Sequence, residues 1–175
     1  MERVRQCLGS QHRTNDHVEL MEAVEKIVYR HPFWKNLNPY YFHILEECAG
    51  CVHFGFGQPI FQADSDAEYF YLIDQGSVAL EMLVRGKGLT TIQTIGAGEA
   101  LGWSWLFPPY RWHFSARSHA ATEGVAFAAR VLRHYAEADQ GFGHELAMRV
   151  GQMMLERLQA TRAKLVHFYA AIKDE

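Results

Sequence analysis

The sequence predicts a mainly β fold: a jelly-roll barrel with helices before it and a long helix after it. Between residues 51 and 130, apolar and polar residues alternate with a period of two, and turn residues separate short runs. On both sides of this block, apolar residues recur at threes and fours, the spacing of amphipathic helices. We therefore expect a flexible N-terminus (1–16), N-terminal helices (17–50), the barrel (51–130) and a C-terminal helical segment (131–175).

Composition argues against a membrane or nucleic-acid-binding protein. The chain has 175 residues, 49% of them hydrophobic and 21% charged, which is typical of one globular domain. A net charge of −3 without a basic run does not suit a phosphate backbone. No apolar run approaches the ~20 residues of a membrane span, and the N-terminus lacks the apolar core of a signal peptide. We expect a soluble, cytoplasmic protein.

Metal binding and catalysis are not expected. Cys48 and Cys51 have the spacing of a metal-binding pair, but the second pair of a zinc site is missing, and Cys7 stands apart. The ten histidines include no His-x-His or His-x-x-x-His, so the ligands of a metal-dependent jelly-roll enzyme are absent. Haem with Cys51 or His113 as axial ligand, and an iron–sulfur site, are alternatives that the neighbouring residues do not favour.

Two helices are predicted before the barrel. From His17 the apolar residues follow the spacing of an amphipathic helix. Pro32 closes this helix, because the residue before a proline avoids the helical region. Asn38 has the character of an N-cap, so a second helix is expected over 39–49. Gly50 is expected to end it.

The barrel strands are predicted from the alternating segments. Turn signals rich in Gly, Asp, Ser and Pro separate the segments. The last two strands are expected to meet at a turn formed by residues 122–124. The expected strands cover residues 52–56, 60–61, 69–73, 78–84 and 89–95, with two closing strands between 115 and 129.

The stretch 96–120 has the build of an anion-binding cassette. Its glycines permit positive φ angles and a close backbone approach. A single helical turn is expected over 103–107, and its free N–H groups would face an anion. A guanidinium and a hydroxyl follow on Arg111 and Ser115. The glycines that punctuate the cassette are Gly96, Gly98 and Gly102.

A long helix is predicted from about residue 144. Some 25 helical residues would extend about 40 Å, which is longer than a small barrel can cover. Part of the apolar stripe is therefore expected to pair with the same helix of a second subunit. The alternative is a helix that folds wholly back on its own barrel. The stripe comprises Leu146, Val150, Met153, Met154, Leu158, Leu165 and Phe168, with Arg157, Arg162 and Lys164 expected to face elsewhere.

The order of these elements resembles the cyclic-nucleotide-binding domain of the catabolite-activator and fumarate-nitrate regulator superfamily. The resemblance covers about four-fifths of the chain, from His31 to Phe168. It implies the jelly-roll fold and a cyclic nucleotide, or another small anion, as ligand. Its motifs are Phe54-x-x-Gly57-Gln58-x-Ile60-Phe61, Phe70-Tyr71-Leu72-Ile73-x-x-Gly76-x-Val78, Gly98-Glu99-x-x-Gly102 and Glu156-Arg157-Leu158-Gln159-x-Thr161.

The charged ligand-binding residues of the family are missing here. In the family, a glutamate that binds the ribose follows the glycine matching Gly102, and this position is Trp103. The arginine that neutralises the phosphate is replaced by Phe114. Losing that arginine alone would weaken nucleotide binding roughly tenfold to a hundredfold.

Other positions keep the family's pattern or offer a substitute. Ser115 and Ala116 match small residues that supply a hydroxyl and a backbone N–H. Thr161 matches a threonine that contacts the adenine, whereas Arg162 replaces the adjacent serine. The expected ligand-binding residues are Gly102, Trp103, Ser104, Arg111, Phe114, Ser115, Ala116, Arg117, Thr161 and Arg162, with Arg111, Arg117 or Arg162 as sources of the missing charge.

The expected function is that of a dimeric, stand-alone regulatory domain. The chain stops at Glu175 without room for the family's helix-turn-helix, so direct DNA binding is not expected. The aromatic residues of the cassette either line a smaller, altered pocket or fill it. The first outcome gives a ligand-responsive sensor or interaction module. The alternative is a degenerate domain that binds no nucleotide and acts as a dimeric scaffold for a protein partner.

Overall fold

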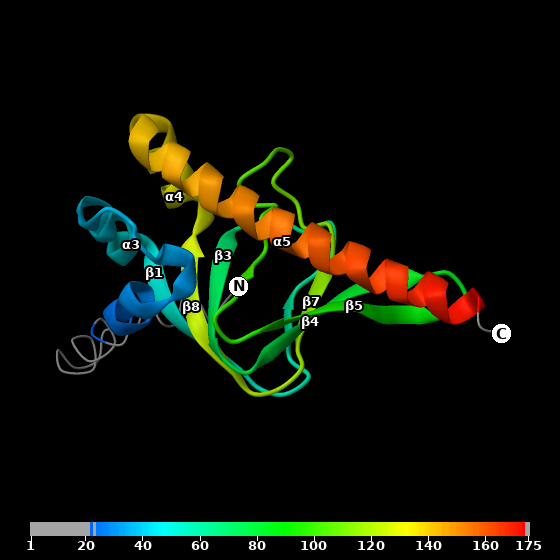
Figure 1. Cartoon of the computed structure of the whole chain (residues 1–175). Helices are drawn as coiled ribbons and strands as arrows, with labels where there is room; N and C mark the ends of the chain where they lie inside the picture. Colours follow the sequence, from blue (N-terminus) through cyan, green and yellow to red (C-terminus); the bar gives the residue numbers. More distant parts are fainter. Residues whose placement is uncertain (1–21, 23, 174–175) are drawn as a thin grey trace.

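The computed structural model describes residue 22 and residues 24–173. An antiparallel barrel of two sheets lies beneath a long C-terminal helix that crosses the molecule (Figure 1). The predicted fold class is therefore confirmed. The N-terminus expected to be flexible, and the start of the first predicted helix, lie outside the described residues.

In the sequence, helical elements precede and follow the barrel. Residues 24–30 are helical, and the segment ends before Pro32, as the sequence predicts. The other helical elements are the 3₁₀ turns η1 (Pro32–Trp34) and η2 (Pro39–Tyr41), the helix α3 (Phe42–Cys48), and the helices α4 (Ala129–Ala138) and α5 (Gln140–Lys173).

The second predicted helix is shorter than expected. Asn38 caps it as predicted, since its side chain accepts from the N–H of Tyr40 at 3.0 Å. The helix then ends at Cys48, and Ala49 and Gly50 belong to the first strand instead. Both residues pair with the last strand of the barrel, Ala49 opposite Phe127 and Gly50 opposite Ala126, and a sequence pattern does not show this pairing.

Eight strands form two four-stranded antiparallel sheets, with orders β1-β8-β3-β6 and β2-β7-β4-β5. Each sheet combines strands that are distant in sequence, so the barrel closes through long-range pairing. The strands are β1 (Ala49–Phe54), β2 (Pro59–Phe61), β3 (Tyr69–Gln75), β4 (Ser77–Val84), β5 (Gly88–Gly96), β6 (Ala100–Leu101), β7 (Ser115–Ser118) and β8 (Thr122–Ala128).

The predicted turn at 122–124 is wrong, because these residues begin β8. The chain reverses just before them, at residues 119–121. Gly124 instead serves the packing of β8 on β3, where an added Cβ would lie 2.1 Å from the carbonyl oxygen of Leu72. This glycine signals a close approach of two strands rather than a turn.

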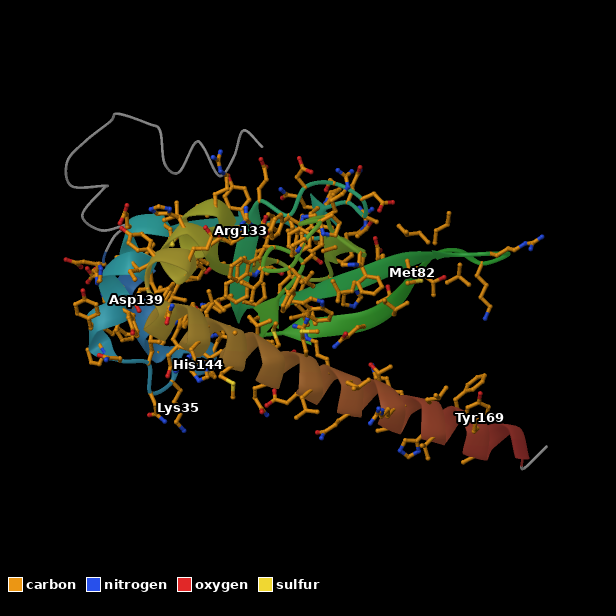
Figure 2. The ribbon with its side chains drawn as sticks, turned by 90° about the horizontal axis from the view of Figure 1, so that it is seen from above. Lys35, Met82, Arg133, Asp139, His144 and Tyr169 are labelled. Carbon is orange, nitrogen blue, oxygen red and sulfur yellow. The ribbon has the colours of Figure 1, made fainter. Side chains whose placement is uncertain are left out.

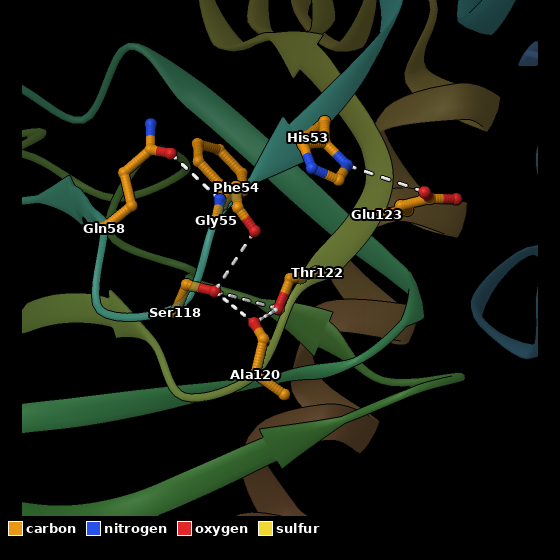
Figure 3. A network of polar contacts seen from close by, with 8 residues as sticks. All are labelled: His53, Phe54, Gly55, Gln58, Ser118, Ala120, Thr122 and Glu123. Atoms are coloured by element: carbon orange, nitrogen blue, oxygen red, sulfur yellow. Dashed lines mark hydrogen bonds and ion pairs between the residues drawn. The ribbon is translucent and has the colours of Figure 1, made fainter.

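A buried hydroxyl network holds the connection between β7 and β8 (Figure 3). The Ser118 hydroxyl lies 3.4 Å from the carbonyl oxygen of Phe54 and 3.2 Å from Thr122 Oγ1. Thr122 also donates to the carbonyl of Ser77 at 3.0 Å. Because Thr122 is fully buried and bonded in this way, it is fixed at the start of the strand.

Aromatic rings from four parts of the chain make the centre of the core. The ring of Phe70 on β3 lies 5.3 Å from Trp105, 5.9 Å from Phe127 and 6.3 Å from Trp34, measured between centroids. Trp105 belongs to the cassette and Trp34 to η1. The core therefore ties the cassette directly to the N-terminal elements and to β3.

The long helix α5 packs on the barrel with only part of its length. It has 34 residues, so it extends about 51 Å. Phe142, Leu146, Val150 and Met153 are buried, whereas residues 158–170 are exposed. Figures 1 and 2 show this half of α5 running beyond the body of the barrel. None of the helices in the described part of the chain combines the length and apolar character needed to cross a bilayer.

The N-terminal segment is fastened to the end of β3. Arg30 donates two hydrogen bonds to the Asp74 carboxylate, at 2.7 and 2.6 Å. The next residue, His31, is buried; its Nδ1 accepts from the N–H of Phe33 at 3.2 Å, and its Nε2 lies 3.3 Å from the carbonyl of Ile73. This pattern requires the neutral tautomer with the proton on Nε2.

Burial of His31 predicts that the protein loses stability in mild acid. Desolvation lowers the pKa of His31 below 6.5, the ordinary value that the unfolded chain retains. As pH falls through about 6.5, the unfolded state therefore takes up a proton that the folded state does not, and the free energy of unfolding decreases. Urea unfolding between about pH 7.5 and 5 should show this decrease.

The matched variant is His31→Asn, which keeps a side-chain acceptor for Phe33 but does not titrate. Its free energy of unfolding should fall less steeply over the same pH range. Equal slopes for the two proteins would contradict the assignment of this effect to His31.

Candidate functional site

The candidate site is the cassette, residues 96–120, which runs from the end of β5 through β6 and β7. Gly98 and Gly102 have φ angles of +81° and +86°, so both need glycine's freedom, whereas Gly96 does not show a positive φ. Of the helical turn predicted over 103–107, a single hydrogen-bonded turn is present, and it is not part of a helix. Residues 104–106 form an isolated turn, closed by a bond from the N–H of Leu106 to the carbonyl of Trp103 at 3.0 Å. The cassette therefore lacks the helix N-terminus that would attract an anion.

Aromatic rings occupy the interior of the cassette. Trp112 is buried and stacks on Phe61 of β2, with centroids 3.7 Å apart and an interplanar angle of 8°. The Trp112 indole also lies against Gly102, where an added Cβ would be 2.4 Å from Trp112 Cζ3. Gly102 is therefore needed for two reasons, its backbone conformation and the space that the indole takes.

The cavity that remains, called here the cassette cavity, has a volume of about 20 Å³. A water molecule needs at least about 10–15 Å³ on this measure, so there is room for one. Four predicted residues line the cavity: Gly102, Trp103, Ser104 and Phe114. The lining residues outside the predicted ligand-binding set are Phe61, Leu80, Trp112, His113 and Arg157.

Arg157 of α5 is the one Lys, Arg, Asp or Glu among the residues that line the cassette cavity. Its side chain is 7% exposed and lies over the ring of Trp103, with Cζ 5.2 Å from the centroid. One Nη donates to the carbonyl of Ala100, and the other is buried without a hydrogen-bond partner. Burial lowers the pKa of Arg157 to about 10, and the charge of Glu99 offsets only part of this effect.

The sequence prediction that Arg157 faces away from the barrel is wrong. Arg157 lies four residues after Met153 and seven after Val150, so it shares the buried stripe of α5. This periodicity was the signal that could have identified it. Hydrophobicity alone assigned an arginine to the solvent, although its methylene groups and planar head pack well against an indole.

Polar contacts fix the rest of the cassette. Ser104 is buried, and its hydroxyl lies 2.9 Å from Nδ1 of His113. Arg133 of α4 donates to the carbonyl of Trp105 at 2.6 Å, and its Cζ lies 4.4 Å from the ring centroid of Tyr110. The cassette is therefore anchored to α4 as well as to α5.

The other predicted site residues are engaged elsewhere. Arg111 pairs with Asp66 at 3.2 Å and also bonds the carbonyl of Asp64, so it holds the loop after β2. Arg117 pairs with Glu81 at 3.3 Å and donates to the carbonyl of Gly57 at 2.8 Å.

The remaining four lie on β7 and α5. The Ser115 hydroxyl accepts from the N–H of Ala63 at 3.1 Å, and Ala116 is buried next to it in β7. Thr161 donates to the carbonyl of Arg157 within its own helix at 2.8 Å. Arg162 is exposed on α5. None of these six residues lines the cassette cavity.

No group of three or more His, Cys, Asp or Glu side chains suited to a metal ion occurs among residues 22 and 24–173. Cys48 and Cys51, the two cysteines within this range, form no disulfide bond. Burial raises the pKa of Cys48 to about 12, which keeps this thiol protonated and unreactive at neutral pH.

Comparison with solved structures identifies the architecture. A protein from Geobacter metallireducens named for cyclic nucleotide binding matches with a TM-score of 0.70 and 25% identity, over 78% of this chain and 98% of that chain. A cyclic nucleotide-binding domain from Methylobacillus flagellatus matches with a TM-score of 0.69 and 17% identity, over 83% and 82% of the two chains.

A third match is the regulatory subunit of a cAMP-independent protein kinase A from Trypanosoma brucei. Its TM-score is 0.64 at 16% identity, over 83% of this chain and 53% of that chain. No family model and no curated protein matches the sequence. The resemblance inferred from the sequence motifs is therefore confirmed by the fold.

The environment of Arg157 generates a prediction about stability. A buried cation with no ion pair and one unbonded Nη costs folding energy, so we expect Arg157→Met to leave the free energy of unfolding within about 1 kcal/mol of the native value, or to raise it. Chemical denaturation at one fixed protein concentration measures the change. A loss of about 3 kcal/mol or more would show instead that Arg157 is essential for the fold.

Proposed function

Because the chain has the cyclic-nucleotide-binding-domain fold of the catabolite-activator superfamily, we propose that it is a non-catalytic regulatory module that works without a nucleotide in its cassette. In this proposal it acts in the cytoplasm as a homodimer and as an interaction domain for a protein partner. It corresponds to the second of the two functions expected from the sequence.

The closed cassette carries this proposal. Ligand sites for small molecules usually have volumes of about 300–1,000 Å³. The cassette cavity has about 20 Å³, because Trp112, Phe61 and Trp103 fill the space. A cyclic nucleotide would have to displace stacked rings, and removing a buried tryptophan from its contacts costs about 3–5 kcal/mol. An altered nucleotide pocket is therefore less well supported than a filled one.

Electrostatics supports the same proposal. The family's phosphate-binding arginine corresponds to Phe114, and the two arginines nearest in sequence, Arg111 and Arg117, pair with carboxylates of the protein. Arg157 is a cation at the cassette, but it lies over Trp103 and bonds Ala100. The neighbour from Trypanosoma brucei is described as cAMP-independent, which agrees with regulatory use of this fold without that ligand.

The exposed half of α5 supports the homodimer. Four apolar side chains on it are 36–63% exposed: Met154, Leu158, Leu165 and Phe168. With Gly151 and Thr161 they occupy positions separated by three and four residues in strict alternation, which is the a/d pattern of a coiled coil. We call this row the seam.

The β4–β5 hairpin extends the proposed dimer surface. It projects from the barrel on the same side as the exposed half of α5, as the positions of Met82 and Tyr169 show (Figure 2). Its apolar side chains Met82, Leu83, Leu89 and Ile92 are 39–77% exposed. A second subunit paired along the seam would also contact this hairpin surface beside the helix. Several large apolar side chains exposed together favour such an interface.

We expect no binding of cyclic AMP or cyclic GMP to the native protein. Isothermal titration calorimetry and thermal shift with each nucleotide at about 1 mM should give no heat of binding and no change in Tm, because a ligand specific for the folded state would raise Tm. A saturable heat with a Kd in the micromolar range would overturn the closed-cassette proposal.

The homodimer is tested at Leu165, near the C-terminal end of the seam. Leu165→Glu places a charge at the apolar interface of each helix, so we expect a monomer at micromolar concentration. Val166→Glu is the control, since residue 166 lies about 100° further around the helix and is 67% exposed. Sedimentation equilibrium should find a dimer for the native protein and the control. A monomeric native protein, or equal dissociation of both variants, would contradict the seam.

A further inference from the structure

A second and larger cavity lies on the flank of α5, where the helix passes the β5–β6 turn and η1. We call it the flank groove. Its volume is about 490 Å³, within the range of small-molecule sites. Phe33, Glu99, Arg149, Met153, Glu156 and Arg157 are among its lining residues.

The flank groove is separate from the proposed dimer seam. Arg149, Met153, Glu156 and Ala160 of the groove follow one another at spacings of four, three and four. At 100° per residue, this row lies roughly 150° around the helix from the row of Leu158 and Leu165. A coiled-coil dimer would therefore leave the groove accessible.

Opposite charges line the groove without pairing across it. Arg149 is paired with Glu145 at 3.1 Å, outside the lining. Glu99 accepts only from the N–H of Gly96, at 2.6 Å, and Glu156 accepts from Gln152 at 2.8 Å. In the described part of the chain, neither of these carboxylates forms an ion pair, and the Arg157 guanidinium forms none.

We infer that the flank groove binds a small zwitterion of the α-amino-acid class. A carboxylate next to Arg157 would add to the counter-charge there, which Glu99 supplies only in part, and an ammonium group would complement Glu156 and Glu99. Phe33 and Met153 offer apolar contact to a side chain. A neutral or singly charged ligand would leave one of the two charged sides uncompensated.

This inference explains why a cation is kept at position 157. The guanidinium is 7% exposed and lacks a carboxylate partner, an arrangement that stability alone does not favour. Bound ligand would pair with it and would touch α5, the β5–β6 turn and η1 together. The inference goes beyond the nucleotide-independent function proposed above. The two can be tested independently, because the groove and the cassette cavity share only Arg157 among their lining residues.

The test is a thermal-shift screen of the native protein with each of the twenty L-amino acids at about 10 mM, followed by calorimetry. We expect at least one amino acid with an apolar side chain to raise Tm by several degrees, since a ligand of the folded state stabilises it by mass action. No rise in Tm and no heat with any of the twenty would overturn the inference.

Two alanine-to-leucine substitutions locate the binding site. Ala160→Leu narrows the groove and should abolish the shift, whereas Ala163→Leu makes the same change on α5 outside the lining and should preserve it. Both positions are exposed in a helix, so both variants should fold. Binding that survives Ala160→Leu unchanged would place the ligand elsewhere and refute the proposed site.

The zwitterionic character of the ligand is tested with analogues that lack one charged group and with the variant Glu156→Gln. The des-amino acid and the decarboxylated amine of the best ligand should each bind at least tenfold more weakly, and Glu156→Gln should weaken the intact amino acid by a similar factor. Full-strength binding of either fragment, or an unchanged Kd in the variant, would rule out recognition of a zwitterion.

Discussion

The contact between Trp112 and Gly102 constrains the whole cassette. The indole lies where any side chain at position 102 would extend, and it stacks face to face on Phe61 of the opposite sheet. One ring thus joins β2 to the loop after β6 and takes the volume in which a ligand would sit. Protein interiors have the packing density of organic crystals, so a cavity filled in this way does not admit a second molecule without rearrangement. The closed cassette is a direct result of this packing.

The filled cassette changes the role of the charged residue on the long helix. The resemblance implies a glutamate and an arginine that hold ribose and phosphate, and this chain has Trp103 and Phe114 there. Arg157 then lies over the indole of Trp103 instead of meeting an acid. A cation over a ring keeps helix and cassette in contact, but it does not replace an ion pair in energy. Arg157 also lines the flank groove, together with Glu99 and Glu156, whose carboxylates form no ion pair among the described residues.

Helix α5 therefore presents three distinct sides. One side, with Leu146 and Val150, is buried on the barrel and fixes the helix. A second side presents the seam, and a third lines the flank groove. Because a rigid helix holds these sides in a fixed relation, a ligand in the groove would act on the same element that carries the proposed dimer seam. Such an arrangement suits a regulatory domain whose output is its own association.

The sequence by itself determined the fold class, the capping of η2 by Asn38, the end of the first helix before Pro32, and the family resemblance, because these follow from local periodicity, turn chemistry and motif spacing. Only the tertiary structure decided the rest. The strand identity of Ala49, Gly50 and Thr122 depends on partners more than 40 residues away. Whether aromatic residues line a pocket or fill it depends on side-chain packing between sheets, and the same residue types serve both. The charge of Arg157 predicts an exposed side chain, but its position on the buried stripe of α5 places it in the interior. There the planar guanidinium packs on the ring of Trp103, so position on the helix has more influence than residue type.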